Sequence, residues 1–508
     1  MPSRRHPVQA LALAGPNPPN VYLAIADTLY CVSNTSSKVV ATWKAPAPPL
    51  QGKQPQKKPV ANDTVKADGL STGPSAADTS VTDSAADSPS SLPATVVGKR
   101  KRSQSNASAP QPSIPPAEGV DAKPAAPGSK SSKKNKKSGN EGGGAGSSAL
   151  KKQPLNYIGH LLFIPSKNVL AVTTLEDKTL RLLNPDTLEV VKEWPLHKRP
   201  SAISLMDDGY TILVGDKFGD VYSYKPADEE AEAQGKLLLG HVSLLTTLTS
   251  SSSNNGTSER KFVITADRDE HIRVTNYPLT HVIHGFCLAH TAFVSRLLVT
   301  ADNLLVSGGG DDWLGVWNWK DGELLQQVDV RGVVEELFTG EEMKELVGKM
   351  KEYHPQRRRM REDDAMQEEK EDDDETISLA VNEIVEVNVP GRERGKEIVV
   401  TLEGVPVLLR YAYGATGKLE YAGSVRTPGP VISLTVHNST VYLGCDSESG
   451  GLISRVDLAD PGASLDDFLS GAGFEGPEVG EENAGVVIER LYSVEGFRKG
   501  FGGLGDDD

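Results

Sequence analysis

Short stretches of alternating apolar and polar residues recur along this chain in pairs, and a tight turn separates the members of each pair. The clearest pair begins at residues 262–265, passes through the charged turn DRDE, and returns with Ile272 and Val274 between polar neighbours. A second copy occupies residues 304–319, with the turn GGGDD between its two apolar runs. Alternation with a period of two is typical of half-buried strands, so both copies are predicted to be strand–turn–strand units.

Weaker copies of the same pattern lie on both sides of these two. Together they give seven candidate units, near Val21, Val169, Thr211, Val263, Leu304, Ile398 and Val441. Seven such units, each completed to four short strands, would form an all-β, seven-bladed propeller, which leaves few strand edges exposed. The alternative is an incomplete repeat array followed by a separate C-terminal sandwich.

Polar residues at matching positions of the clearest units indicate the type of blade. A His before the unit, an Asp in its turn and an aromatic residue on the returning strand form the internal hydrogen-bond set of WD-repeat blades, whose period is about 40–45 residues. These positions are held here by His241 and His290, by Asp269 and Asp311, and by Trp317. The two His residues are 49 apart, and the polar run at 250–260 is expected to hold the excess as a loop.

Composition divides the chain into propeller and insertions. We predict strands of the first blade at 1–44, blades 2 to 5 at 153–330, and blades 6 and 7 at 376–460. Segment 45–152 has hardly an aromatic residue and is predicted to be disordered, because it cannot bury enough apolar surface. Its sixteen Lys and Arg against eight Asp and Glu give it a charge of +8, and the rest of the chain −23. Such a segment suits nuclear import or loose attraction to RNA, or is a solubilising linker.

Two further segments interrupt or follow the repeats. Segment 331–375 opens at helical spacing and continues with blocks of opposite charge, so it is predicted to be partly helical and to leave the propeller as a mobile excursion. A helix that docks a partner is the alternative. Residues 461–508 are expected to help close the propeller and end in an acidic tail.

Catalytic chemistry has little support in the sequence. The Gly-rich runs do not leave a strand and open a helix, as a nucleotide-binding turn does, and no His group completes a metal site. We therefore predict a protein without catalytic or metal-binding residues that is not an enzyme. Cys31, Cys287 and Cys445 lie in apolar strand contexts, which predicts buried thiols in a reducing compartment. No apolar run has membrane-spanning length, so a soluble, intracellular protein without a membrane partner is expected.

The charged turn of the fourth unit is the main candidate binding site. Arg268, Asp269 and Glu270 lie in the turn, Arg273 follows on the returning strand, and Lys217 of the third unit matches Arg268. A charge inside a blade must be paired or must reach the rim. Two interpretations remain open: Arg273 pairs with an acid of its own blade, or it joins Lys217 and Arg268 in a basic rim. Clusters of mixed sign suit a protein partner better than nucleic acid.

Four motifs around this turn resemble a known family. They are VGDKFGDVYS, GHVSLLT, ADRDEHIRV and FCLAHTAFVS, all within about residues 212–319. Together they resemble the WD-repeat, non-catalytic subunit of the eukaryotic tRNA (guanine-N7)-methyltransferase, in its fungal form. The run DDWLGVWNWKDG departs from the pattern at Trp313, which is expected to be an extra exposed aromatic residue.

The resemblance implies a function and a set of contact residues. A catalytic partner subunit would bind S-adenosylmethionine and form N7-methylguanosine in the tRNA variable loop. This chain would bind and stabilise that subunit in a heterodimer, hold no cofactor itself, and meet tRNA through the complex. The family contact maps onto Lys217, Asp269, Glu270 and Arg273, and a nuclear location is expected. The alternative function is a WD-repeat scaffold in ribosome biogenesis or chromatin.

Overall fold

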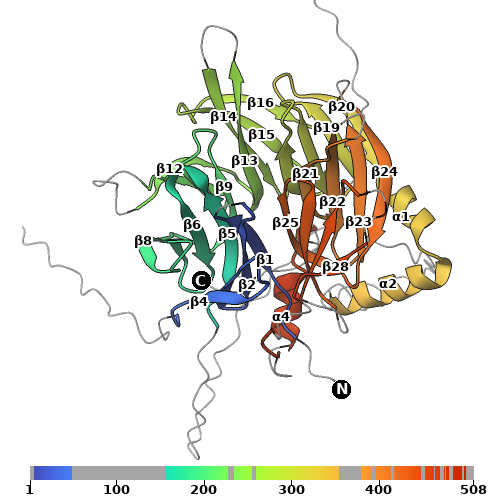
Figure 1. Ribbon diagram of the computed structural model, residues 1–508. Helices are drawn as coiled ribbons and strands as arrows, with labels where there is room; N and C mark the ends of the chain where they lie inside the picture. Colours follow the sequence, from blue (N-terminus) through green and yellow to red (C-terminus); the bar gives the residue numbers. More distant parts are fainter. Residues whose placement is uncertain are drawn as a thin grey trace, which may run out of the picture. The chain divides into compact units, whose positions relative to one another are not determined.

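A computed structural model describes most of the chain outside residues 49–154. The described residues are 5–48, 155–226, 234–254, 259–353, 379–391, 395–413, 417–447, 452–469, 474, 476–479, 484–494 and 497–498, without 16, 461 and 463. In this part of the chain, strands form seven four-stranded sheets, and the four strands of each sheet are consecutive in the sequence and antiparallel (Figure 1). We number these sheets as blades 1 to 7.

The strands are short, and each blade runs from an inner to an outer strand. Blades 1 to 4 consist of β1 (Ala10–Ala14), β2 (Asn20–Ile25), β3 (Thr28–Val32) and β4 (Val39–Lys44); β5 (Ile158–Ile164), β6 (Val169–Thr174), β7 (Thr179–Leu183) and β8 (Val190–Pro195); β9 (Pro200–Leu205), β10 (Ile212–Asp216), β11 (Asp220–Tyr224) and β12 (Lys236–Gly240); and β13 (Leu245–Asn254), β14 (Glu259–Asp267), β15 (Ile272–Tyr277) and β16 (Ile283–Cys287). Blades 5 to 7 consist of β17 (Val294–Val299), β18 (Leu305–Gly309), β19 (Trp313–Asn318) and β20 (Glu323–Asp329); β21 (Val381–Asn388), β22 (Lys396–Leu402), β23 (Val407–Tyr413) and β24 (Leu419–Arg426); and β25 (Val431–His437), β26 (Thr440–Cys445), β27 (Ile453–Asp457) and β28 (Asp466–Asp467).

Apolar side chains fill the spaces between neighbouring blades. Seven clusters of buried residues each join two adjacent blades, and one of them joins blade 7 to blade 1, so the ring is closed. Between blades 4 and 5, for example, Ile264 and Val274 pack with Leu305 and Trp317. The predicted seven-bladed propeller is confirmed, and the alternative of a separate C-terminal sandwich is wrong because blades 6 and 7 belong to the ring.

Two expectations about segments between strands are corrected. The polar run at 250–260 is not simply a loop, because β13 continues to Asn254 and β14 begins at Glu259. The four consecutive Ser residues at 250–253 continue the ladder with β14, so most of the excess length extends this hairpin. Trp313 is not an exposed aromatic residue either. Its ring stacks on His290, with ring centroids 4.4 Å apart, and is partly buried.

The segment after blade 5 forms two helices that pack against the propeller, α1 (Arg331–Leu337) and α2 (Gly340–Tyr353). Val334, Phe338 and Met350 join the apolar cluster between blades 5 and 6, and Figure 1 shows both helices beside β24. The backbone N–H of Thr339 donates to Glu342 over 2.7 Å, which caps the start of α2. A mobile excursion is therefore the wrong description of residues 331–353, whereas residues 354–378 lie outside the described residues.

Chain segments far apart in the sequence meet where α2 ends. The Tyr353 ring stacks on Tyr492, just beyond α4 (Ala484–Leu491), with centroids 3.8 Å apart. The hydroxyl of Tyr492 donates to Asp446 in blade 7, and the backbone N–H of Val494 donates to Glu403 in blade 6. These contacts attach the C-terminal helix to the propeller. The predicted disordered segment 45–152 lies almost wholly outside the described residues and stays a prediction.

Candidate partner-binding site

Blade 5 contains the predicted internal hydrogen-bond set. His290 Nδ1 lies 2.6 Å from Asp311 Oδ2, and His290 Nε2 lies 2.7 Å from Ser307 Oγ. Trp317 Nε1 donates to the same hydroxyl over 2.8 Å. Because the Asp311 carboxylate can only accept, Nδ1 carries the proton, and a continuous relay runs from Trp317 to Asp311. The sequence reasoning missed Ser307, although a small hydroxyl residue recurs near the end of the second strand in several blades.

Blade 4 uses a different acid from the predicted one. His241 Nδ1 lies 2.9 Å from Asp267 Oδ2, and Nε2 lies 2.7 Å from Thr265 Oγ1. Asp269, which matches Asp311 by position, was predicted to make this contact, and that structural assignment is wrong. The reason is that blade 4 has an aspartate at the end of its second strand, Asp267, where blade 5 has Gly309, so this buried carboxylate reaches the imidazole instead.

The Asp267 carboxylate also holds the turn that carries the candidate residues. Its Oδ1 accepts hydrogen bonds from the backbone N–H groups of Asp269, at 2.9 Å, and His271, at 3.2 Å. Burial raises the pKa of Asp267, but the hydrogen bonds from His241 and His271 lower it by a larger amount. The pKa of this carboxyl therefore lies below its usual value. Asp267 is therefore a structural residue, and Asp269 lies on the turn that it orders.

Blade 3 repeats this turn beside blade 4. Asp216 Oδ1 accepts hydrogen bonds from the backbone N–H groups of Phe218, at 2.9 Å, and Asp220, at 3.1 Å, as Asp267 does in blade 4. Lys217 therefore occupies the position equivalent to Arg268, as the sequence predicted. The His241 backbone N–H donates to the carbonyl of Gly219 over 2.9 Å. Because His241 also contacts Asp267, the two turns lie on either side of one residue.

Glu270 adopts a backbone conformation that favours glycine. Its φ is +76°, and at the equivalent place in blade 3 stands Gly219, with a φ of +100°. A side chain at positive φ costs about 1–2 kcal/mol. Blades 2 and 5 also have a side chain at positive φ at this position, at Lys178 and Asp312, so the backbone conformation is common to these turns. The turn of blade 4 therefore presents a carboxylate on a left-handed backbone that several blades share.

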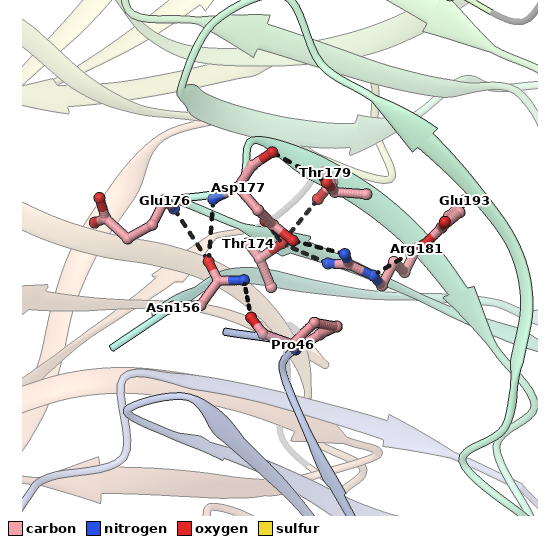
Figure 2. Close-up of polar contacts among 8 residues, drawn as sticks. All are labelled: Pro46, Asn156, Thr174, Glu176, Asp177, Thr179, Arg181 and Glu193. Carbon is pink, nitrogen blue, oxygen red and sulfur yellow. Dashed lines mark hydrogen bonds and ion pairs between the residues drawn. The ribbon is translucent and has the colours of Figure 1, made fainter. Parts of the chain in front are cut away.

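Arg181 in blade 2 illustrates how a blade satisfies an internal arginine. Its guanidinium donates to Thr174 over 2.8 Å and to Asp177 over 2.6 Å, and it lies 3.3 Å from a Glu193 carboxylate oxygen. Figure 2 shows this network together with Asn156, whose side-chain oxygen accepts hydrogen bonds from the turn N–H groups. All of these partners come from the same blade or from the segment that leads into it. Arg181 is consequently a structural residue.

Arg273 in blade 4 lacks such partners. Within the described chain it donates one hydrogen bond, from Nη1 to the carbonyl of Gly240 over 3.1 Å, and forms no ion pair. Its Nε and Nη2 groups are buried without a hydrogen-bond partner, as is Nε of Arg268. Burial lowers the pKa of Arg273, and the negative charge of Asp267 only partly offsets this effect. The interpretation in which Arg273 pairs with an acid of its own blade is therefore wrong.

The candidate residues thus come together on two adjacent turns and the strand that follows. Lys217 and Arg268 hold equivalent positions on these turns, and Asp269, Glu270 and Arg273 follow directly in blade 4. Lys217 Nζ lies 5.2 Å from the ring centre of Phe218, whose exposure the sequence reasoning did not predict. The sequence signal for this exposure is that Phe218 occupies a turn position that is held by a polar residue, Asp269, in blade 4.

Other kinds of site find no support in the part of the chain that the structure describes. It contains no group of three or more His, Cys, Asp or Glu residues able to hold a metal ion. Among its helices, none has both the length and the apolar character needed to cross a bilayer. Cys31, Cys287 and Cys445 are buried free thiols, as predicted. Burial raises the pKa of the Cys287 thiol to about 12, which disfavours the thiolate form.

Comparisons with known proteins agree with the resemblance found in the motifs. The family model described as "tRNA methyltransferase TRM82 WD40 domain" matches residues 21–234 and 224–460. Proteins named "tRNA (guanine-N(7)-)-methyltransferase non-catalytic subunit" are similar to this chain. The one from Phaeosphaeria nodorum is 30% identical over 435 residues, which cover 69% of this chain and 84% of that protein.

Two further relatives match over shorter stretches. The subunit from Aspergillus oryzae is 41% identical over 211 residues, which cover 30% of this chain and 43% of that protein. The subunit from Meyerozyma guilliermondii is 39% identical over 193 residues, which cover 36% of this chain and 44% of that protein. The matched parts therefore span less than half the length of these two relatives. The match to the family model extends over most of the chain, and the chain belongs to the family of the tRNA methyltransferase TRM82 WD40 domain, whose relatives are named non-catalytic subunits.

Proposed function

We propose that this protein is the non-catalytic subunit of a tRNA (guanine-N7)-methyltransferase and that it binds and stabilises the catalytic subunit in a heterodimer. The names of its relatives and the family match support this proposal. S-adenosylmethionine would bind to the partner only, and tRNA would be met through the complex, with N7-methylguanosine formed in its variable loop. The proposed compartment is the nucleus, to which two basic clusters of segment 45–152, GKRKR at 98–102 and KSSKKNKK at 130–137, would direct the chain.

The observation that carries the proposal is the lack of carboxylate partners for the cations of blades 3 and 4. Arg181, Arg296 and Arg410 each lie within 3.3 Å of a carboxylate oxygen, whereas Arg268 and Arg273 form no ion pair with the described residues. A partly buried guanidinium with unused N–H groups is satisfied when an acid of another protein reaches it. We assign that role to acids of the catalytic subunit, which would contact Arg273, Arg268 and Lys217.

The two acids of the same turn would set the specificity of the contact. Asp269 and Glu270 stand beside Arg268, so a partner surface has to offer basic groups next to its acidic ones. An interface in which signs alternate rejects uniformly acidic molecules, including nucleic acid, more strongly than a purely basic rim would. Truncating Arg273 would leave the partner's acid unpaired, at a cost of about 2–5 kcal/mol of association.

Co-purification of the catalytic subunit with Arg273→Glu tests the proposal. We expect a large loss of the partner, because a buried attraction becomes a repulsion. The matched control is Arg260→Glu, which places the same change on an exposed residue of the neighbouring strand β14, at the end of the blade away from the turn. Recovery of the partner with Arg273→Glu equal to wild type would remove Arg273 from the interface.

Deletion of the gene tests the function as a whole. The methyltransferase proposal predicts that N7-methylguanosine in bulk tRNA falls, because the unsupported catalytic subunit is less stable. Unchanged N7-methylguanosine would favour a scaffold in ribosome biogenesis or chromatin instead.

A further inference from the structure

Exposed apolar side chains are concentrated in blades 3 and 4. Of the fourteen large hydrophobic residues that are exposed in the described chain, eight lie between Phe218 and Leu288. Scattered exposed hydrophobic residues are ordinary on a protein surface, but a local concentration marks an interaction surface. The other six are distributed over residues 40–191 and 325–421.

Four of the eight residues surround the cations described above. They are Phe218, Val242, Phe286 and Leu288, and we call them the blade 3–4 patch. Phe218 follows Lys217 in the turn of blade 3, and Val242 follows His241, which lies between the two turns. Phe286 pairs with Arg273 across β15 and β16, so the two side chains extend from the same face of the sheet.

Exposure within the blade 3–4 patch is extensive. Val242 is fully exposed, Leu288 is 62% exposed and Phe218 is 50% exposed. The Arg273 guanidinium reaches the carbonyl of Gly240, two residues before Val242, and Arg273 pairs with Phe286 across the strands, so the charged group lies near two of the four patch residues. This combination of apolar side chains around incompletely bonded arginines is typical of the centre of a protein interface, where a few anchors dominate affinity.

We propose that the blade 3–4 patch is the apolar anchor of the interface with the catalytic subunit and that it receives an apolar surface of that subunit flanked by acidic side chains. This proposal rests on the proposed function. Charge complementarity selects the occupant, since Lys217, Arg268 and Arg273 require acids while Asp269 and Glu270 oppose a polyanion. Phe218 and Phe286 are aromatic and could stack on bases, but Val242 and Leu288 are aliphatic and could not, so half of the patch would have no role in an RNA platform.

Affinity measurements with the full chain and the purified catalytic subunit test this proposal. Val242→Ser and Leu288→Ser are expected to raise Kd about tenfold or more, as the loss of an interface anchor does. Val191→Ser is the matched control, because Val191 is also 62% exposed and lies on the outer strand β8 of another blade. Its Kd is expected to equal that of wild type. High salt should weaken wild type and both patch variants in the same proportion, because the apolar contribution is not screened.

The outcomes separate this proposal from the one on which it rests. If Val242→Ser and Leu288→Ser bind like wild type while Arg273→Glu does not, the anchor is refuted and the proposed function stands. If all three bind like wild type, both proposals fail. Fluorescent tRNA and size-exclusion chromatography of the chain alone complete the experiment. A loss of tRNA binding or of self-association in the patch variants, with unchanged affinity for the subunit, would assign the patch to RNA or to a second copy.

Discussion

Arg181 and Arg273 occupy comparable strands of two blades, yet replacing each with methionine should change the free energy of unfolding to very different extents. Arg181 is 5% exposed and contacts Thr174, Asp177 and Glu193. Arg181→Met would leave the buried Asp177 carboxylate without its cation, which costs about 3–5 kcal/mol. We therefore expect a strong decrease in the free energy of unfolding of this variant.

Arg273→Met removes much less from the folded chain. One hydrogen bond to Gly240 is lost, worth about 1 kcal/mol, but two buried N–H groups that lack partners disappear with it. The lowered pKa of Arg273 points the same way, since it means that the folded chain disfavours the charged form. We expect the free energy of unfolding to stay within about 1 kcal/mol of wild type.

Urea denaturation of the isolated chain, followed by circular dichroism, measures both variants without the partner. A parallel titration with the catalytic subunit should give the reverse order, with Arg273→Met binding weakly and Arg181→Met binding normally where it is folded. The reasoning is refuted if Arg273→Met loses as much stability as Arg181→Met, because Arg273 would then be a structural residue of its own blade.

Three further predictions concern the turns and their networks. Ser307→Ala should lower the free energy of unfolding by about 2–4 kcal/mol in urea denaturation, because it leaves His290 Nε2 and Trp317 Nε1 buried without partners. Glu270→Gly should raise the free energy of unfolding by about 0.5–1 kcal/mol, because glycine adopts the positive φ without strain. The same variant should bind the catalytic subunit more weakly. A lower free energy of unfolding in this variant would argue against strain at Glu270. Burial raises the pKa of Asp311, but the hydrogen bonds to its carboxylate lower the pKa by more than burial raises it. The contribution of Asp311 to stability is therefore complete above about pH 4 and is lost as the pH falls through the lowered pKa. Denaturation from pH 6 to pH 3 should show a steeper loss for wild type than for Asp311→Asn.

Local sequence patterns were sufficient to predict the ring of blades. Each of the seven predicted units falls on or beside the second strand of one blade, because that strand is buried on both faces and its apolar run is continuous. The second-strand runs are those of β2, β6, β10, β14, β18, β22 and β26. The helical spacing of the segment after blade 5 was also visible in the sequence. The packing of Val334 and Phe338 against the propeller was not predicted, because the charge blocks of the segment are typical of a solvated excursion.

The details of the site depend on pairing between strands, which the sequence does not display. Asp269 has the expected position in the motif, but Asp267 stands at the strand end that Gly309 occupies in blade 5, and Asp267 takes the contact with His241. The sequence also does not show that Arg273 lacks a carboxylate partner, because acids of the same blade lie close to it in the sequence. The equivalence of Lys217 and Arg268 was predictable, since both follow an Asp in the same short turn.

The assignment of four consecutive strands to every blade determines how the chain can fold during synthesis. A blade of this kind is complete as soon as its own fourth strand leaves the ribosome, and no early strand waits for a late one. Closing the ring is different, because it joins Val8 to Ser433, whose hydrogen bond spans 425 residues. Contacts so distant in sequence form slowly. Blade-by-blade growth followed by one late closure is therefore the folding order that this topology favours, and the surface between blades 3 and 4 would exist before the ring is closed.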